Sequence, residues 1–305
     1  MSLQDYLSRY YSASTARLYR FEIDHYLAEV GSSKASQAGY RDLLVHLSSL
    51  RDRYENTGTL HRILQAIKCY YRYLLESGVR DDHPAKNISL RDVRPGQIQL
   101  QDLLTEIELQ ALLLPRQERY PMLARRNRVV MSLLVNQALV LQEMAALKID
   151  DIDLEKATIR AAGTAKLNPR KLRLKADQIL LLHDYLVQDR PQLLRIPTDV
   201  LILTSRGTAE RGEGIHYLVE TYRAMIPGKK LTPTTIRQSV LHLRLQKGED
   251  LRHTQAFAGH KNPSSTEQYR QSRLEVLRRA VDKYHPLSQS QSGTSSPQRG
   301  NLNHH

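Results

Sequence analysis

The stretch AGHKNPSSTEQYRQS, residues 258–272, contains side chains that can carry out covalent chemistry. His260 follows a glycine, and Tyr269 comes nine residues later, after a loop-like NPSS and Thr266. A tyrosine hydroxyl becomes a nucleophile when neighbouring groups activate it. The chain has 16 tyrosines, so an ordinary packing role for Tyr269 is the alternative. The motifs elsewhere in the chain therefore decide between the two roles.

A basic run lies upstream, at residues 156–175, and contains no acidic residue. Its cations are Lys156, Arg160, Lys166, Arg170, Lys171, Arg173 and Lys175. The whole chain carries 45 Lys and Arg against 32 Asp and Glu, a formal net charge of +13 with a pI near 9.8. Such an excess favours a polyanionic partner, and its local clustering favours phosphate binding. Solvated surface charge is the simpler alternative.

Length and composition limit the class of protein. The 305 residues are enough for one large or two ordinary domains. No apolar run reaches the roughly 18 residues of a membrane span, and the N-terminus lacks the apolar run of a signal peptide. The single cysteine, Cys69, excludes an internal disulfide. These features predict a cytoplasmic protein without membrane attachment.

The elements that must position these residues begin with a helical region at 1–87. Apolar residues recur at helical spacing in segments 12–31, 37–54 and 57–78, with Ser14 or Thr15 expected to cap the first. Residues 81–100 contain Pro84, Pro95 and Gly96 and no long apolar period, which indicates an interdomain linker.

Beyond the linker the pattern predicts further helices around one small sheet. Thr105 can cap a helix, and residues 125–147 form a nearly all-apolar stretch that predicts one long buried helix. The segments IDDIDLE, ATIRAA and RKLRL predict three short strands, with GTAKLNP as the turn between the last two. Helices are expected again at 176–191, 232–248, 249–260 and 273–286, and a disordered polar tail at 288–305. The expected fold class is mainly α with a small antiparallel β-sheet.

Taken in order, these motifs resemble the tyrosine recombinases, the Xer, Cre and phage-integrase family. RRNRVVMSLLVNQALVLQEMAALKIDDIDL is similar to the first conserved box of that family, and TIRQSV followed by LQKGEDLRHTQAFAGHKNPSSTEQY is similar to the second. The resemblance implies a helical core-binding domain at 1–87, a linker at 88–101, a catalytic-type domain at 102–287 and a tail at 288–305.

The resemblance also implies a reaction. In this family a tyrosine attacks a DNA phosphate, forms a 3′-phosphotyrosine link and releases a 5′-hydroxyl, with no metal and no other cofactor. Two arginines hold the non-bridging oxygens and offset charge in the transition state. A lysine on a β-turn protonates the leaving oxygen.

Carried over residue by residue, the resemblance places Tyr269 at the nucleophile, His260 at the second histidine position and Arg237 at the second arginine. Lys166 is the candidate for the turn lysine, and Lys156, Arg170 and Lys171 remain rivals. The side chains expected to contact DNA phosphates are Lys156, Arg160, Arg170, Lys171, Arg173, Arg62 and Lys68.

Two positions depart from the family pattern. Val140 stands where the arginine of the first box belongs, although Glu143 remains in register. Thr234 replaces the histidine three residues before Arg237. A preorganised donor at a transition state contributes roughly 3–4 kcal/mol, so both losses should matter. Arg160, on the neighbouring strand, or a partner chain are the alternatives for supplying the missing charge.

Two functions follow from this pattern. The first is a site-specific recombinase acting on double-stranded DNA, as a tetramer on paired sites. The second is a catalytically impaired homologue that serves as an accessory or regulatory DNA-binding subunit. A helix-turn-helix transcription factor would explain the basic charge but not the ordered boxes.

Overall fold

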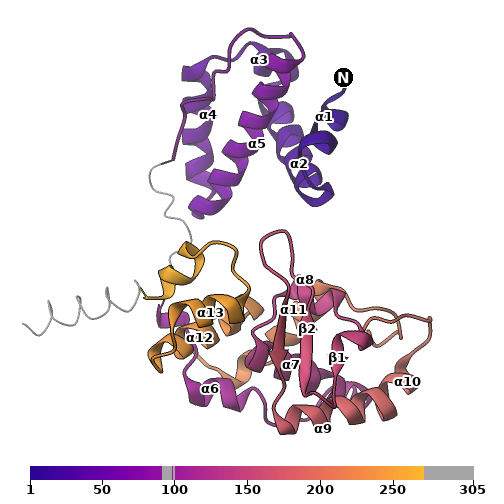
Figure 1. Cartoon of the computed structure of the whole chain (residues 1–305). Coiled ribbons are helices and arrows are strands. Elements are labelled where there is room, and N and C mark those ends of the chain that lie inside the picture. The colour runs from indigo at the N-terminus through magenta and orange to yellow at the C-terminus, as the bar shows by residue number, and fades with distance from the viewer. Residues whose placement is uncertain (91–97, 99, 271–305) are drawn as a thin grey trace, which may run out of the picture. The chain divides into compact units, whose positions relative to one another are not determined.

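The computed structural model describes residues 1–90, 98 and 100–270, which divide into two compact units, Met1–Gly96 and Gln97–His305 (Figure 1). Helices predominate in both units, and one small antiparallel sheet lies in the second. The predicted fold class is therefore confirmed. The helix expected at 273–286, the tail at 288–305 and part of the linker lie outside the described residues. None of the described helices has the length and hydrophobicity needed to cross a membrane.

The N-terminal unit is built from helices around an apolar core. They are α1 (Leu3–Tyr10), α2 (Ala13–Val30), α3 (Ser32–Gln37), α4 (Tyr40–Arg53) and α5 (Thr57–Glu76). The apolar stripe of α5 is buried against α2, and the hydroxyls of Tyr26 and Tyr71 lie 2.7 Å apart inside this core. Ser12, rather than Ser14 or Thr15, caps α2, because its side chain accepts the backbone N–H of Thr15.

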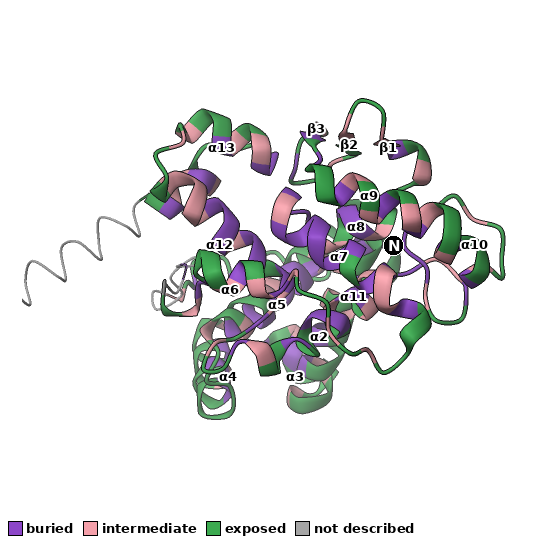
Figure 2. Cartoon of the chain, turned by 90° about the horizontal axis from the view of Figure 1, so that it is seen from below, coloured by how far each residue is buried: buried purple, intermediate pink, exposed green. Residues whose placement is uncertain are grey.

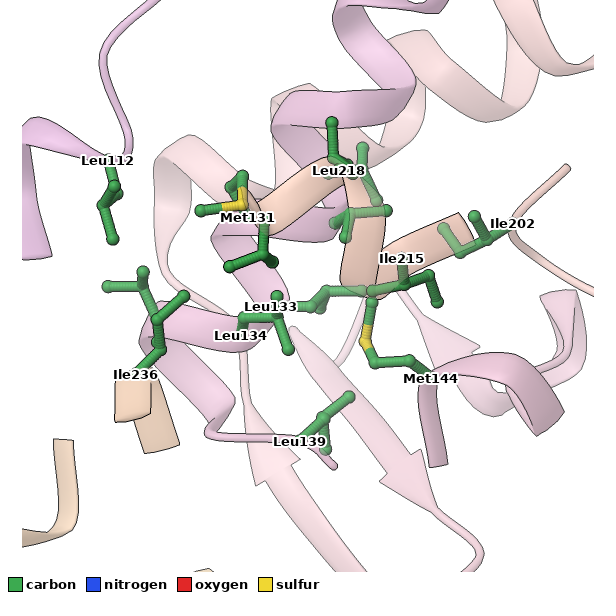
Figure 3. Close-up of a cluster of buried hydrophobic side chains, with 14 of the residues drawn as sticks. Leu112, Met131, Leu133, Leu134, Leu139, Met144, Ile202, Ile215, Leu218 and Ile236 are labelled. Atoms are coloured by element: carbon green, nitrogen blue, oxygen red, sulfur yellow. The ribbon is translucent and has the colours of Figure 1, made fainter. Parts of the chain in front are cut away.

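The C-terminal unit surrounds the buried helix α7 (Ala124–Gln137). Its other α-helices include α6 (Glu106–Ala111), α8 (Leu141–Ala146), α9 (Ala176–Asp184), α10 (Arg190–Leu193), α11 (Gly212–Glu220), α12 (Pro233–Gln246) and α13 (Leu251–Ala258). Burial follows α7 along most of its length (Figure 2). Its Met131, Leu133 and Leu134 lie among buried side chains from α8, α11 and α12, including Met144, Leu218 and Ile236 (Figure 3).

The single long helix predicted at 125–147 is wrong. The chain leaves α7 at Ala138, which adopts the left-handed conformation (φ 50, ψ 38), and α8 begins after Val140, its N-cap. Leu139 between them is fully buried, so apolarity continues through the break and gave no sign of it. The turn is stabilised by tertiary contacts, because Arg237 donates to the carbonyl oxygen of Ala138.

The predicted strands form an antiparallel sheet in the order β1 (Ile152–Asp153), β2 (Thr158–Ala161), β3 (Arg170–Arg173). Ile159 pairs with Leu172, and both are buried on the inner face. Ala161 pairs with Arg170 two residues along, and therefore on this same inner face. The strand thus directs one of its arginines toward the interior of the unit.

Candidate active site

Tyr269 lies in a helical segment, residues 264–270, with its ring held in an apolar cluster. The residue is 5% exposed, and the buried side chains packed with it are Ile98, Leu103, Leu241 and Ala258. Its ring is stacked near that of His260, with centroids 6.4 Å apart and an interplanar angle of 9°. Burial raises the pKa of the tyrosine, and the charge of Arg237 opposes this shift. The phenol is therefore protonated before any reaction.

His260 is fixed by a hydrogen bond at each ring nitrogen. Nε2 lies 3.2 Å from Nη2 of Arg237, and Nδ1 lies 2.8 Å from Oγ1 of Thr266. A guanidinium only donates, so Nε2 must be the acceptor and Nδ1 must carry the proton that it donates to Thr266. Burial, with the charges of Arg237 and Arg170, lowers the pKa of His260 to about 4. The imidazole is therefore neutral at physiological pH.

Arg237, in the first half of α12, joins three segments of the unit. Its guanidinium donates to the carbonyl oxygen of Ala138 and, at 2.5 Å, to that of Ala258 at the end of α13. Burial lowers its pKa to about 10, the nearby charge of Arg170 contributes to this, and Glu143 opposes it. The guanidinium remains positively charged at neutral pH, beside His260.

The second guanidinium at this site belongs to Arg170 of β3. Its Nη1 and Nη2 lie 2.5 Å and 3.1 Å from the two carboxylate oxygens of Glu143, and its Nε donates to the carbonyl oxygen of Phe257 at 2.6 Å. The side chain of Arg170 is 6% exposed and that of Glu143 is 0% exposed. This arginine, expected among the DNA contacts of a basic hairpin, thus lies inside the site and not on its outer surface.

The turn between β2 and β3 is attached to the segment that carries His260. Asn168 donates its backbone N–H to the carbonyl oxygen of Gly259 at 2.7 Å, and Leu167 forms a β-bridge with His260. Nζ of Lys261 donates to the carbonyl oxygen of Ala165 at 3.0 Å. Lys166 lies on this turn with an exposed side chain, for which the described residues provide no hydrogen-bond or ion-pair partner. It is thus a free cation next to the histidine segment.

The two substituted positions contribute no charge. Val140 is the N-cap of α8, and its backbone N–H donates to Oε2 of Glu143 at 3.1 Å. Thr234 is exposed in the first turn of α12. The cationic side chains described in this region are therefore Arg170, Arg237, Lys166 and Lys261.

The remaining basic residues of the hairpin point outward. Lys171 and Arg173 are exposed on β3, Arg160 pairs with Asp151 at 3.0 Å, and Lys156 pairs with Asp153 at 3.0 Å. Arg160, considered as a substitute for the missing arginine, thus has a carboxylate of its own.

In the N-terminal unit, Arg62 lies 2.9 Å from a carboxylate oxygen of Glu22, and Nζ of Lys68 donates to the carbonyl oxygen of Lys86 at 3.2 Å. Burial lowers the pKa of Lys68, and the charge of Arg72 adds to this shift. Arg62 keeps an exposed guanidinium, whereas Lys68 is partly engaged within its own unit.

Thr266 is the functional residue whose role the sequence concealed. It is fully buried, and its hydroxyl oxygen accepts the Nδ1–H of His260. Its position six residues after the histidine gives the only signal, because a helical turn starting at Pro263 brings it back to the ring. No group of three or more His, Cys, Asp or Glu side chains suited to a metal ion occurs within the described ranges.

Comparison with known proteins identifies the family to which this chain belongs. The phage integrase family model matches residues 103–275. The tyrosine recombinase XerC of Roseiflexus sp. (strain RS-1) is 28% identical over 272 residues, covering 85% of this chain and 83% of the relative. The tyrosine recombinase XerD of Staphylococcus epidermidis (strain RP62A) is 27% identical over 287 residues, covering 90% of this chain and 93% of the relative.

Solved structures show the same fold. The XerH site-specific recombinase bound to a palindromic difH substrate matches with a TM-score of 0.70 at 22% identity, covering 88% of this chain and 79% of that one. The Tn1549 transposon integrase in complex with transposon right end DNA matches with a TM-score of 0.67 at 16% identity, covering 92% and 100%. Since the family model spans more than half of the sequence, this chain belongs to the phage integrase family, the family of the tyrosine recombinases.

Proposed function

We propose that this protein binds double-stranded DNA and catalyses site-specific strand exchange with Tyr269 as the nucleophile. The observation that carries the proposal is the single cluster formed by Tyr269, His260 and Arg237, residues that lie up to 32 positions apart in the sequence. A neutral histidine, a buried guanidinium and a phenol in one place are the groups that attack on a phosphodiester requires.

The proposed step conserves the number of phosphodiester bonds. The Tyr269 oxygen bonds to phosphorus and the bond from phosphorus to the 5′-oxygen breaks. The strand segment that keeps its 3′-oxygen–phosphorus bond remains attached to the protein, and the other segment leaves with a 5′-hydroxyl. The phenol proton leaves with the attack, and the Nε2 lone pair of His260 is the proposed acceptor once Arg237 turns to the phosphate. The leaving 5′-oxygen takes a proton, for which Lys166 is the proposed donor. Attack by a 5′-hydroxyl reverses the step without an energy source.

The relatives suggest how the chain is used. The XerH and Tn1549 integrase structures contain DNA, which supports duplex DNA as the partner here. We propose that residues 1–87 act as a core-binding domain and residues 102–287 as the catalytic domain, with four copies on paired sites. We also propose a cytoplasmic location, because the proposed substrate is DNA.

A covalent-adduct assay tests this function. Duplexes bound by the protein are first selected from a random-sequence pool, and the selected site is then made with a nick that prevents religation. We expect a DNA-linked band that disappears in Tyr269→Phe while DNA binding persists. Selective binding without any adduct would instead support an accessory DNA-binding role, and no binding at low salt would refute both.

A further inference from the structure

The first box leaves a gap in the phosphate site that another element can fill. Residue 140 is a valine, whose side chain has no hydrogen-bond donor. Its backbone N–H already donates to Glu143. Arg237 alone would have to balance the two charged non-bridging oxygens of a phosphodiester under attack. A second cation must therefore come from a side chain that reaches the pocket of Arg237 and His260.

Arg170 meets this requirement by its position. Arg170 and Arg237 donate to the consecutive carbonyls of Phe257 and Ala258, so their guanidiniums lie side by side at the end of α13. Gly259 lies directly against the guanidinium of Arg170, since a Cβ added to this glycine would lie 2.8 Å from Nη1 of Arg170. The charge of Arg170 also lowers the pKa values of both Arg237 and His260.

Both guanidiniums retain donors for a ligand. Each has five N–H groups. Arg170 uses Nε and one N–H of each terminal nitrogen, which leaves one N–H on each of those nitrogens without an acceptor among the described residues. Arg237 likewise has Nε and one N–H of Nη1 left, since its partners within the described part of the chain are Ala138, Ala258 and His260.

Glu143 gives Arg170 a fixed orientation. Its carboxylate is fully buried, accepts from both terminal nitrogens of the arginine, and is itself held by the backbone of residue 140. A buried carboxylate that fixes a guanidinium preorganises the remaining donors. Val140, at the position of the first-box arginine, thus helps to hold Arg170 through its backbone contact with Glu143.

We propose that Arg170 supplies to the scissile phosphate the guanidinium that position 140 lacks. This inference rests on the proposed strand cleavage. Arg170 would contact a non-bridging oxygen on one side while Arg237 contacts the other, and Glu143 acts as a positioning residue for Arg170.

The test compares Arg170→Met, combined with Glu143→Gln so that no unpaired buried carboxylate remains, with the unsubstituted chain. Adduct formation is measured on the selected nicked duplex with either a phosphate or an uncharged methylphosphonate at the scissile position. We expect the variant to be slower by about 100- to 1000-fold on phosphate, and by less than about tenfold on methylphosphonate. A merely structural role would produce equal losses on both substrates and would overturn the inference.

Two further variants sharpen the result. Arg126→Met with Glu210→Gln removes another buried ion pair, in which Nη2 of Arg126 lies 2.6 Å from Oε2 of Glu210. Arg126 is near the opposite end of α7, so this change should leave the ratio of the adduct rates on phosphate and methylphosphonate unchanged. Val140→Arg added to the Arg170→Met/Glu143→Gln chain should restore at least tenfold of the phosphate rate, and absence of any rescue would count against the inference. If the unsubstituted chain binds the site but forms no adduct, the proposed function itself is refuted. The inference that Arg170 contacts a scissile phosphate then fails with it.

Discussion

At the scale of single residues, the site depends on which nitrogen of His260 carries the proton. Thr266 and Arg237 together fix the proton at Nδ1 and leave the lone pair at Nε2. Here a threonine hydroxyl accepts the Nδ1–H hydrogen bond that a backbone carbonyl or a carboxylate often accepts. Two predictions follow from this neutral, oriented imidazole.

Thr266→Val keeps the side-chain shape and removes the acceptor for Nδ1–H. We expect adduct formation to slow by about 10- to 100-fold, because part of the ring population will rotate or change tautomer. Thr266→Ser, which retains the hydroxyl, is the matched control and should stay within about threefold of the unsubstituted chain. The ¹⁵N shifts of the imidazole report the tautomer directly, and an unchanged Nδ1–H form together with an unchanged rate in the valine variant would show that Thr266 has no part in fixing the ring.

His260 should titrate far below an ordinary histidine. Its pKa of about 4 in the folded chain compares with about 6.5 when unfolded. The neutral form is favoured by folding, so this contribution to stability is complete above about pH 6.5 and is lost as the pH falls toward 4, by at most about 3 kcal/mol.

NMR titration of the His260 Cε1 proton, assigned with His260→Gln, measures this midpoint. Arg237→Met should raise it, because the guanidinium charge is the second largest cause of the shift after burial. A midpoint near 6.5 in the unsubstituted chain would show that the ring is hydrated.

At the scale of elements, the site is a junction of α12, the end of α13, the α7–α8 turn and the β2–β3 turn. Gly259 is its tightest point, with φ at +73 and room for no Cβ between Arg170 and the carbonyl oxygen of Asn168. Its left-handed conformation ends α13 and turns the chain into His260.

Gly259→Ala is therefore expected to reduce adduct formation at least tenfold and to lower the thermal midpoint. The control is Gly248→Ala, a position with a similar φ of +85 but nothing within 4 Å of an added Cβ. That change should cost only the strain of the left-handed backbone, about 1 kcal/mol, and leave the rate unaffected. Equal loss of activity in both variants would mean that crowding of Arg170 is not the cause.

Sequence reasoning succeeded where a local pattern determines the structure. The short strands were predicted by their change of period, and Thr105 was correctly predicted to cap α6. The turn at Ala138 was missed, because buried apolar residues flank it on both sides and only its contact with Arg237, 99 residues away, explains it. The inward direction of Arg170 was readable in principle, since RKLRL places it on the same face as buried Leu172. The role of Glu143 depends on a contact 27 residues away and was not readable.

At the scale of the whole molecule, the positions of the basic side chains determine what the net charge of +13 can do. On β3 the alternation separates two functions: Arg170 points inward to the site, and Lys171 and Arg173 remain exposed. We propose that the exposed pair contacts the DNA backbone, whereas the buried side chain of Arg170 does not take part in nonspecific binding.

The salt dependence of DNA binding tests this division. Replacing Lys171 and Arg173 with Met should weaken binding to all sequences and reduce the slope of log K against log salt by about 1.8, or about 0.9 for each phosphate that is no longer neutralised. Arg223→Met, a change at an exposed position in the short helical segment Arg223–Met225, is the control and should leave the slope unchanged. An unaltered slope in the double variant would place the DNA away from the outer face of β3.

The burial of Tyr269 also affects the timing of the reaction. Its ring is held by Leu103, Leu241 and Ile98, so the nucleophile is stored in an apolar cluster. With Tyr269 as the proposed nucleophile, we expect a conformational step that frees its ring from these neighbours before its hydroxyl reaches a phosphorus atom. We expect DNA that dissociates faster than this step to escape cleavage. We therefore expect the burial of one tyrosine to delay cleavage and so to favour DNA that stays bound for long enough.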